Sequence, residues 1–400
     1  MLRRSTLALL SLMLLLPLGC SQTKTPPTTK EVVKKAPATV LTEKEALAFA
    51  EKLALDIGDK NFSELEDVFD YDSFLDICFG KLDLPEAGYR EISQSFKQEL
   101  KQTPGGLFQN LTDGTLKVLR YHEDDGQPKV LIRALVGDPP ALTYLDLHLI
   151  KNGETIQTFD IFSFAAGERV SESVTRLVLP LVSQMKQTPL QKLVKSGNNE
   201  IEHLEEIMAV INAQNSGDLQ GAISLYEKLP KDVQDKKVVL LVYITALMDA
   251  GDNDKYLAGL EKFNKLYSDD PSSFIHQLDF HFLNKDFDKM RAAIDQLEER
   301  LKVKDPYLDV MRATGYLESK DYEPAIKHIR EAIKAEPELE VAHWALSNTA
   351  LTDKNFQVVA ESLDGLKQFY PDTLAEDLKI NPEYSEFFES ELGKKWLAAQ

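Results

Sequence analysis

The chain has 400 residues, of which 43% are hydrophobic and 28% are charged, a composition typical of a globular protein with about two domains. Its formal net charge is −19, from 65 acidic and 46 basic residues. This balance disfavours nucleic-acid binding, because phosphates repel an acidic surface. We therefore expect no nucleic-acid partner, and we interpret the acidic excess as a solvated surface that favours solubility.

Residues 1–19 have the features of an export signal. A short basic region precedes an apolar run over 6–18, which is shorter than a membrane-spanning helix. The run ends in Leu-Pro-Leu-Gly-Cys, which resembles the lipobox of bacterial lipoproteins and departs from it at Pro17, where leucine is usual. The resemblance implies cleavage of the signal and lipid on Cys20. The alternative is an ordinary signal peptide or an uncleaved anchor.

Residues 20–41 are predicted to form a disordered tether. The segment is rich in Pro, Thr and Lys and carries too few apolar side chains to fold alone. Ser21, directly after the cysteine that is expected to carry lipid, resembles an outer-membrane sorting signal. We therefore expect a protein of the bacterial cell envelope, lipid-anchored to a membrane and, where the envelope has two membranes, on the outer one facing the periplasm.

Residues 42–190 are predicted to form an α+β domain. Thr42-x-x-Glu45 is a capping box at the start of a helix, and Ser63-x-x-Glu66 repeats the signal. A further helix after Pro85 is indicated by apolar residues at helical spacing, namely Tyr89, Ile92, Phe96 and Leu100. Cys78 lies in an apolar run, so we interpret it as a buried hydrophobe rather than a nucleophile or free thiol.

Four antiparallel strands are predicted to follow, over 115–122, 129–136, 141–150 and 154–164. Asp125-Gly126 joins the first pair and Asn152-Gly153 joins the last pair, both as type I′ turns with positive φ at the two central residues. A helix is then expected over 167–185, with a kink at Pro180.

Helices followed by a long antiparallel meander resemble the cone-shaped fold of the nuclear-transport-factor-2-like superfamily. The segment 159–173 (FDIFSFAAGERVSES) resembles the last strand of envelope proteins of this type. The sequence departs from the superfamily in showing no short strand between the early helices. The resemblance implies a fold that supports enzymes, ligand carriers and adaptors alike, so the fold does not decide the function.

Polar residues gather on one face of the predicted sheet. The candidates for a pocket in the cone are Arg133, Tyr144, Asp146, His148 and Asp160. An Asp–His pair could act as a general base in a hydrolase or isomerase, and a pocket in the cone could carry a lipid or another small apolar ligand. The competing interpretation, which we favour, is that these residues form the solvated face of an antiparallel sheet.

Residues 199–371 show an internal repeat. N-cap residues occur 34, 34, 35 and 34 residues apart, at Asp218, Asp252, Asp286, Asp321 and Asn355. Three apolar columns keep the same spacing: Ala222, Tyr256, Met290, Ala325 and Val359; Tyr226, Leu260, Ile294, Ile329 and Leu363; and Leu229, Phe263, Leu297, Ala332 and Leu366. The alternative, a generic helical bundle, would not keep this period.

A period near 34 residues resembles the tetratricopeptide repeat, and the fourth unit matches its pattern best, with Tyr316, Tyr322, Ala325 and Pro337 at the motif's offsets. The resemblance implies an all-α solenoid of five helical hairpins with a concave groove that binds a protein partner. By the register of the repeat, the groove-lining positions are Leu241, Thr245, Ile275, Asp279, Val310, Thr314, Trp344 and Asn348. None is a cation, which disfavours recognition of a C-terminal carboxylate and favours an apolar or basic segment of another envelope protein.

Residues 372–400 are predicted to form helices that cap the solenoid, through Leu378, Tyr384, Phe387, Phe388, Leu392, Trp396 and Leu397. The sequence contains no P-loop, dinucleotide fingerprint, nucleophile elbow or zinc-protease motif. We therefore expect neither catalysis nor a cofactor or metal, and the sequence favours an interaction scaffold over a ligand carrier or an enzyme.

Overall fold

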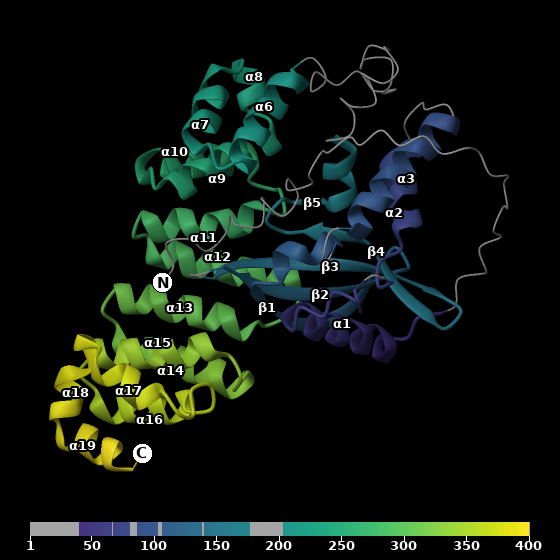
Figure 1. The fold of residues 1–400 in the computed structure, drawn as a ribbon. Helices are drawn as coiled ribbons and strands as arrows, with labels where there is room; N and C mark the ends of the chain where they lie inside the picture. Colours follow the sequence, from purple (N-terminus) through teal and green to yellow (C-terminus); the bar gives the residue numbers. More distant parts are fainter. Residues whose placement is uncertain are drawn as a thin grey trace. The chain divides into compact units, whose positions relative to one another are not determined.

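The computed structural model describes residues 40–65, 67–80, 86–102, 106–137, 140–176 and 203–399 (Figure 1). Cys20, most of the predicted tether and Pro180 lie outside the described residues. The chain divides into two compact units, Met1–Asp279 and Phe280–Gln400. The first contains an antiparallel sheet with helices and continues into further helices, and the described part of the second is helical. The predicted order of an α+β region followed by an all-α region is confirmed.

The sheet of the first unit has five antiparallel strands in the order of the chain. The strands are β1 (Gly114–Asp124), β2 (Gln127–Val136), β3 (Ala141–Asn152), β4 (Thr155–Ser163) and β5 (Glu168–Arg169). The four predicted strands are confirmed, and the two-residue β5 was not predicted. Because alternate residues of a strand point to opposite faces, Leu145, Leu147 and Leu149 share one face of β3, and all three are buried.

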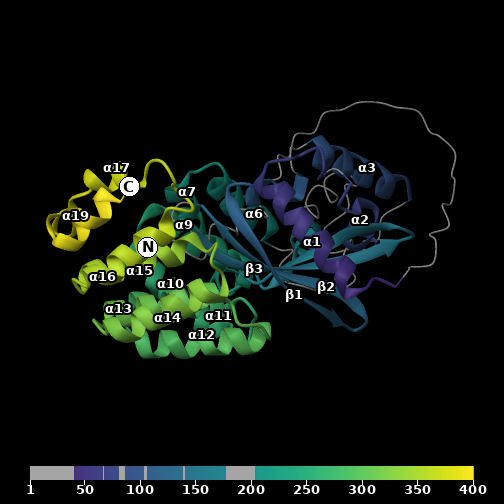
Figure 2. The same ribbon diagram turned by 90° about the horizontal axis from the view of Figure 1, so that it is seen from below.

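One face of the sheet carries an apolar core that helices cover. These elements are α1 (Glu43–Gly58), α2 (Tyr71–Phe79), α3 (Glu86–Gln102) and the 3-10 helix η2 (Gly106–Leu111). In Figures 1 and 2, α1 lies along β1 and β2. The predicted capping box starts α1, since Thr42 accepts from the backbone N–H of Glu45 and Glu45 bonds back to Thr42. Aromatic rings of Phe69, Phe74 and Phe108 meet in the core beneath the sheet.

The second predicted capping box does not start a helix. Residues 62–65 form a turn, and α2 begins instead after Asp70, which accepts a hydrogen bond from the backbone N–H of Ser73. The reason is a tertiary contact: Phe69 pairs with Thr158 of β4, so this stretch of chain is extended. A single β-bridge is therefore present between the early helices, where the sequence showed no short strand.

The two hairpin turns differ from each other. Asp125 and Gly126 both have positive φ, as a type I′ turn requires, and this prediction is confirmed. In the second turn Asn152 pairs with Thr155, so the central residues are Gly153 and Glu154, and Gly153 alone of the two has positive φ. The prediction of a type I′ turn at Asn152-Gly153 was wrong, because pairing of the strands extends through Asn152 and leaves glycine at the first central position, as in a type II′ turn.

Helices fill the rest of the described chain. Those in the first unit are α6 (Leu204–Asn215), α7 (Leu219–Lys228), α8 (Lys231–Gln234), α9 (Lys237–Ala250) and α10 (Asn253–Leu266), and α11 (Ser273–Leu283) spans the boundary. Those in the second unit are α12 (Phe287–Leu301), α13 (Pro306–Glu318), α14 (Tyr322–Ala335), α15 (Glu340–Thr352), α16 (Phe356–Leu366), α17 (Leu374–Lys379), η4 (Pro382–Tyr384), α18 (Ser385–Glu389) and α19 (Glu391–Ala398).

Five helical hairpins share one turn geometry. Each of the five predicted N-cap residues is the N-cap of a second helix, in α7, α10, α12, α14 and α16. In every turn the N-cap backbone N–H donates to the carbonyl five residues earlier, over 2.8–3.0 Å. The residue before each N-cap has positive φ, at Gly217, Gly251, Lys285, Lys320 and Lys354. The repeat seen in the sequence is therefore also a repeat of local backbone structure.

All fifteen residues of the three predicted apolar columns are buried, none more than 7% exposed. The columns therefore mark the packed face of the second helix in each hairpin, as their spacing indicates. The bulky Tyr256 and Met290, which stand where a small residue is usual in the resembled repeat, are buried too.

The C-terminal helices bury much of the predicted apolar set. Leu378, Tyr384, Phe387 and Trp396 are buried, whereas Leu392 is 37% exposed. The hydroxyls of Tyr384 and Ser347 lie 2.7 Å apart, and the Trp396 indole donates to Asp364 over 3.0 Å. The C-terminal residues therefore pack on α15 and α16. Among the described helices, none is both long and apolar enough to cross a bilayer.

Candidate functional site

The polar residues predicted to share one face of the sheet are buried rather than solvated. Their exposed fractions are 3% for Arg133, 0% for Tyr144, 7% for Asp146, 8% for His148 and 0% for Asp160. The expectation of a solvated face was therefore wrong. A buried polar group needs a hydrogen-bond or ionic partner to offset its desolvation, so the partners of these residues decide what they can do.

Asp146 is paired with His122 of β1. His122 Nε2 and Asp146 Oδ1 lie 2.8 Å apart, although β2 runs between their strands. A carboxylate at this distance fixes the imidazole tautomer and leaves Nδ1 as the remaining basic nitrogen, which is the arrangement of a general base. From the sequence, His148 was the expected partner of Asp146, and His122 was not expected to take part. The residues of β1 alternate in the same way, but the sequence gives no register between β1 and β3.

His148 is buried beside the ring of Phe159, with ring centroids 5.9 Å apart. Its burial lowers the pKa of the imidazole to about 4, and the nearby Lys129 acts in the same direction. Among the described residues, His148 Nε2 has no hydrogen-bond partner. His148 is therefore a neutral imidazole at physiological pH. Lys129 forms its own ion pair, with Nζ 2.8 Å from Asp124 Oδ2.

Asp160 belongs to the packing of the following helical turn, residues 170–176. Its carboxylate accepts from the Ser171 backbone N–H over 3.2 Å and from the Ser171 hydroxyl over 2.6 Å. Burial raises the pKa of Asp160, and the bonds to Ser171 oppose that rise. Burial also raises the pKa of the Cys78 thiol, which is 1% exposed, as expected for a small hydrophobe. Asp160 thus caps a helix through Ser171, whereas Asp146 is bonded to His122, so the two carboxylates serve separate contacts.

Tyr144 and Arg133 stand directly opposite each other on β3 and β2. The ring of Tyr144 meets Phe164 edge-on, with centroids 6.2 Å apart. Both side chains are therefore part of a packed face of the sheet, and Tyr144 lies two residues before Asp146 on β3.

The four predicted groove positions in the first unit are buried. Leu241 and Thr245 of α9 are 1% and 2% exposed, and the Thr245 hydroxyl donates to the Leu241 carbonyl. Ile275 of α11 is fully buried, and Asp279 accepts from the Tyr256 hydroxyl over 3.0 Å. Burial raises the pKa of Asp279 to about 7. These positions serve packing in the first unit.

The four predicted groove positions in the second unit are more open. Val310 is 5% exposed, whereas Thr314, Trp344 and Asn348 are half-buried. The Trp344 indole donates to Glu340 over 2.9 Å and lies beside Tyr370, with ring centroids 5.9 Å apart. Trp and Tyr are among the side chains enriched at protein-binding hot spots, and both Trp344 and Tyr370 are half-buried.

A cluster of potential metal ligands occurs in the second unit, at Asp309, His328 and Glu331. The same Asp309 oxygen lies 3.1 Å from His328 Nδ1 and 3.0 Å from Arg312 Nη1. His328 also stacks on Tyr316, with ring centroids 5.6 Å apart. The guanidinium already supplies the positive charge that this carboxylate needs, so the cluster reads as an ion-pair network. Sequence spacing did not reveal it, because its residues come from α13 and α14.

Comparison with known proteins found no matching family model, no similar curated protein and no similar solved structure.

Proposed function

We propose that this protein is a lipid-anchored lipoprotein of the bacterial envelope that acts as a protein-interaction scaffold through tetratricopeptide-like helical hairpins. The observation that supports the scaffold is the turn geometry common to all five hairpins, with its positive-φ residue and N-cap repeated every 34 or 35 residues. A single short hairpin cannot bury its apolar face alone, whereas hairpins of one geometry can stack. The cone-like assignment of the α+β region is part of the same proposal.

The proposed binding surface is the open part of the repeat, where Thr314, Trp344 and Asn348 are half-buried. The partner that fits this surface is an apolar or basic segment of another envelope protein. Glu340 places a carboxylate beside the aromatic pair, and the second unit has 24 acidic against 16 basic residues. Positive charge on the partner would therefore speed the encounter and select the orientation of binding.

Replacing Trp344 by Ala is expected to reduce capture of the partner from envelope extract about 10-fold or more, because a partly buried Trp contributes more to binding than most interface residues. The measurement is quantitative pull-down with the full chain as bait. Ile380→Ala is the control, since Ile380 is an exposed apolar side chain at 85% exposure outside the proposed surface.

A second variant separates loss of binding from loss of folding. Asn348→Arg adds a cation to a surface proposed to hold a basic or apolar segment, and should reduce capture while leaving the far-UV circular dichroism unchanged. Equal recovery of every interacting protein by the wild type, Trp344→Ala and Asn348→Arg would show that the partner does not use this surface.

Replacing Cys20 by Ser is expected to move the folded protein from the membrane to the soluble fraction. The proposed lipid is attached to the thiol of this residue, and a hydroxyl is not acylated in its place. Fractionation of cells followed by immunoblotting measures the shift. Retention of the Ser variant on membranes would require a second membrane contact or an uncleaved signal.

A further inference from the structure

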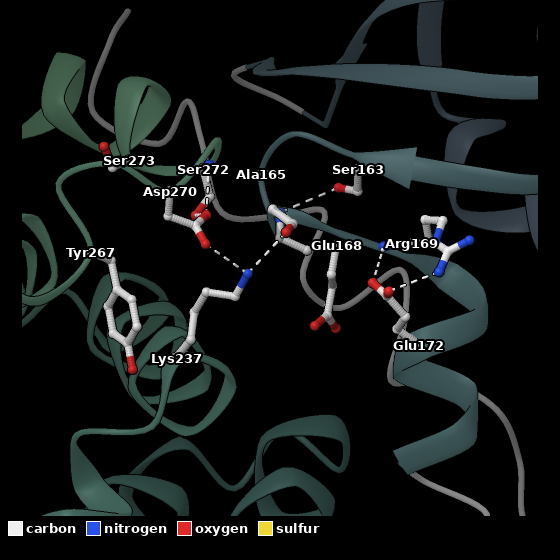
Figure 3. Close-up of polar contacts among 12 residues, drawn as sticks. Ser163, Ala165, Glu168, Arg169, Glu172, Lys237, Tyr267, Asp270, Ser272 and Ser273 are labelled. Carbon is white, nitrogen blue, oxygen red and sulfur yellow. Dashed lines mark hydrogen bonds and ion pairs between the residues drawn. The ribbon is translucent and has the colours of Figure 1, made fainter. Parts of the chain in front are cut away.

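The segment between β4 and β5 is held by side chains at the beginning of α9 and α11 (Figure 3). Lys237, the first residue of α9, donates from Nζ to the Gly167 carbonyl over 2.9 Å and to Asp270 Oδ2 over 3.0 Å. Asp270 also accepts from the Ser272 backbone N–H and hydroxyl, over 2.9 and 2.6 Å. The Gly167 carbonyl thus accepts from the same ammonium group that forms the ion pair with Asp270. The sheet and the helical hairpins of the first unit are joined here.

A second side chain binds the same segment. His276 of α11 is fully buried, and its Nε2 lies 3.2 Å from the Ala165 carbonyl. A carbonyl oxygen only accepts, so Nε2 carries the proton and donates. The ring packs edge-on against Phe263, with centroids 4.9 Å apart. His276 is therefore bound as the neutral Nε2–H tautomer, which leaves Nδ1 as an acceptor.

Protonation of His276 would place a charge and a new donor in this closed site. Among the described residues, Nδ1 has no hydrogen-bond partner. The charged groups that act on the imidazole are Asp270 and Lys237. Asp270 would attract an imidazolium, but its two carboxylate oxygens already accept hydrogen bonds from Lys237 and Ser272. The positive charge of Lys237 would repel the imidazolium. A buried charge without a free counterion is costly, and opening of the contact to water relieves that cost.

We propose that Lys237, Asp270 and His276 form an acid-sensitive latch that fastens the β4–β5 segment to α9 and α11 and releases it when His276 gains a proton. The carbonyls of Ala165 and Gly167 are the held groups. Release would uncouple the sheet from the helical hairpins of the first unit without unfolding either one. An acidic environment would thus weaken the coupling between the sheet and the helical hairpins of the proposed scaffold.

The direction of the pH dependence follows from the proton affinities of the two states. Burial lowers the pKa of His276 from 6.5 to about 4 in the closed latch, whereas the open latch exposes an ordinary imidazole. The stability of the closed form relative to the open form is therefore greatest above pH 6.5. It decreases as the pH falls from 6.5 towards 4. Between pH 7.5 and pH 5 the opening equilibrium is expected to rise about 30-fold.

Hydrogen–deuterium exchange of the full-length protein tests the latch. The reporter is the Gly167 amide, which donates to the Ser163 carbonyl over 2.8 Å, and the reference is the Asp70 amide, bonded to Thr158 of β4 over 2.8 Å. After correction for intrinsic exchange, the protection of Gly167 should fall about 30-fold between pH 7.5 and pH 5. Protection of Asp70 should not change with it.

His276→Gln is the matched variant, because the glutamine amide can donate to the Ala165 carbonyl and does not titrate. Asp279 of α11 also titrates near neutrality, so the difference between wild type and variant isolates the imidazole. Protection of Gly167 in His276→Gln should change less than about 3-fold over the same range. The same pH dependence in both proteins, or none in the wild type, would overturn the proposal.

A second measurement needs no variant, in case His276→Gln does not fold. Histidine-selective isotope labelling and NMR of the wild type give the titration of each imidazole. An Nε2–H tautomer of His276 that titrates near pH 4 supports the latch. Titration near pH 6.5 would show an exposed imidazole and would refute it.

Discussion

Replacing Arg312 by Met is expected to lower the free energy of unfolding of the second unit by about 3–5 kcal/mol, because it leaves the partly buried carboxylates of Glu298 and Asp309 without their cation. Arg312 is 8% exposed. Its Nη2 lies 2.8 Å from Asp295 and 2.6 Å from Glu298, and its Nη1 lies 3.0 Å from Asp309. Burial disfavours the charged guanidinium, but the bonds to Glu298 and Asp295 outweigh it and raise the pKa of Arg312.

The matched control is Arg330→Met, which removes the same side chain from an ion pair with Glu361 that is about half exposed. An exposed pair contributes about 0–1 kcal/mol, because water and salt screen it. Urea unfolding followed by tryptophan fluorescence measures both variants, since Trp344 and Trp396, the two Trp residues of the chain, both belong to the second unit. Equal losses in the two variants would show that the carboxylates around Arg312 do not need it.

Replacing Gly167 by Ala is expected to lower the free energy of unfolding of the first unit by about 2–4 kcal/mol, as the sum of backbone strain and steric overlap. Gly167 has a φ of +63°, which is unfavourable for a residue with a Cβ. A Cβ at this position would also meet the Asp270 carboxylate oxygen that accepts from Ser272. The carboxylate would have to move, and the contact of Lys237 with the Gly167 carbonyl would be lost with it.

Gly153→Ala separates the two contributions. Gly153 has nearly the same φ, +62°, but a Cβ there meets nothing within 4 Å. The free energy of unfolding of this variant should be about 1 kcal/mol lower than that of the wild type, which is the cost of the backbone conformation alone. Urea unfolding followed by far-UV circular dichroism gives both values. If Gly153→Ala and Gly167→Ala lowered the free energy of unfolding equally, the close approach of Gly167 to Asp270 would contribute nothing to the cost of the substitution.

The elements that the sequence predicted well are those set by neighbours along the chain. The Thr42–Glu45 capping box, the Asp125-Gly126 turn and the N-caps at 34-residue spacing depend on contacts within a few residues. The same holds for the buried columns, because one face of a helix is fixed by its period. Ser63-x-x-Glu66 shows the limit of this reasoning: its local signal is overridden by the pairing of Phe69 with β4.

The candidate sites were harder to predict because their members come from separate elements. His122 reaches Asp146 from a strand that is not its neighbour, and the bulge between His148 and Leu149 shifts the register on β4. Polar residues on alternate positions of β3 were expected in water and are buried. Periodicity assigns a residue to a face, but it does not tell what covers that face.

The length of chain between contacting groups has a consequence for the order of folding. Every strand pairs with its neighbour in sequence, and each helical hairpin closes a short loop, so these elements lose little loop-closure entropy when they form. The bonds of the latch close much longer loops, since Lys237 is 70 residues from Gly167 and His276 is 111 residues from Ala165. The sheet and the hairpins would therefore form early in folding, and the bonds that join them through the latch would be among the last to form.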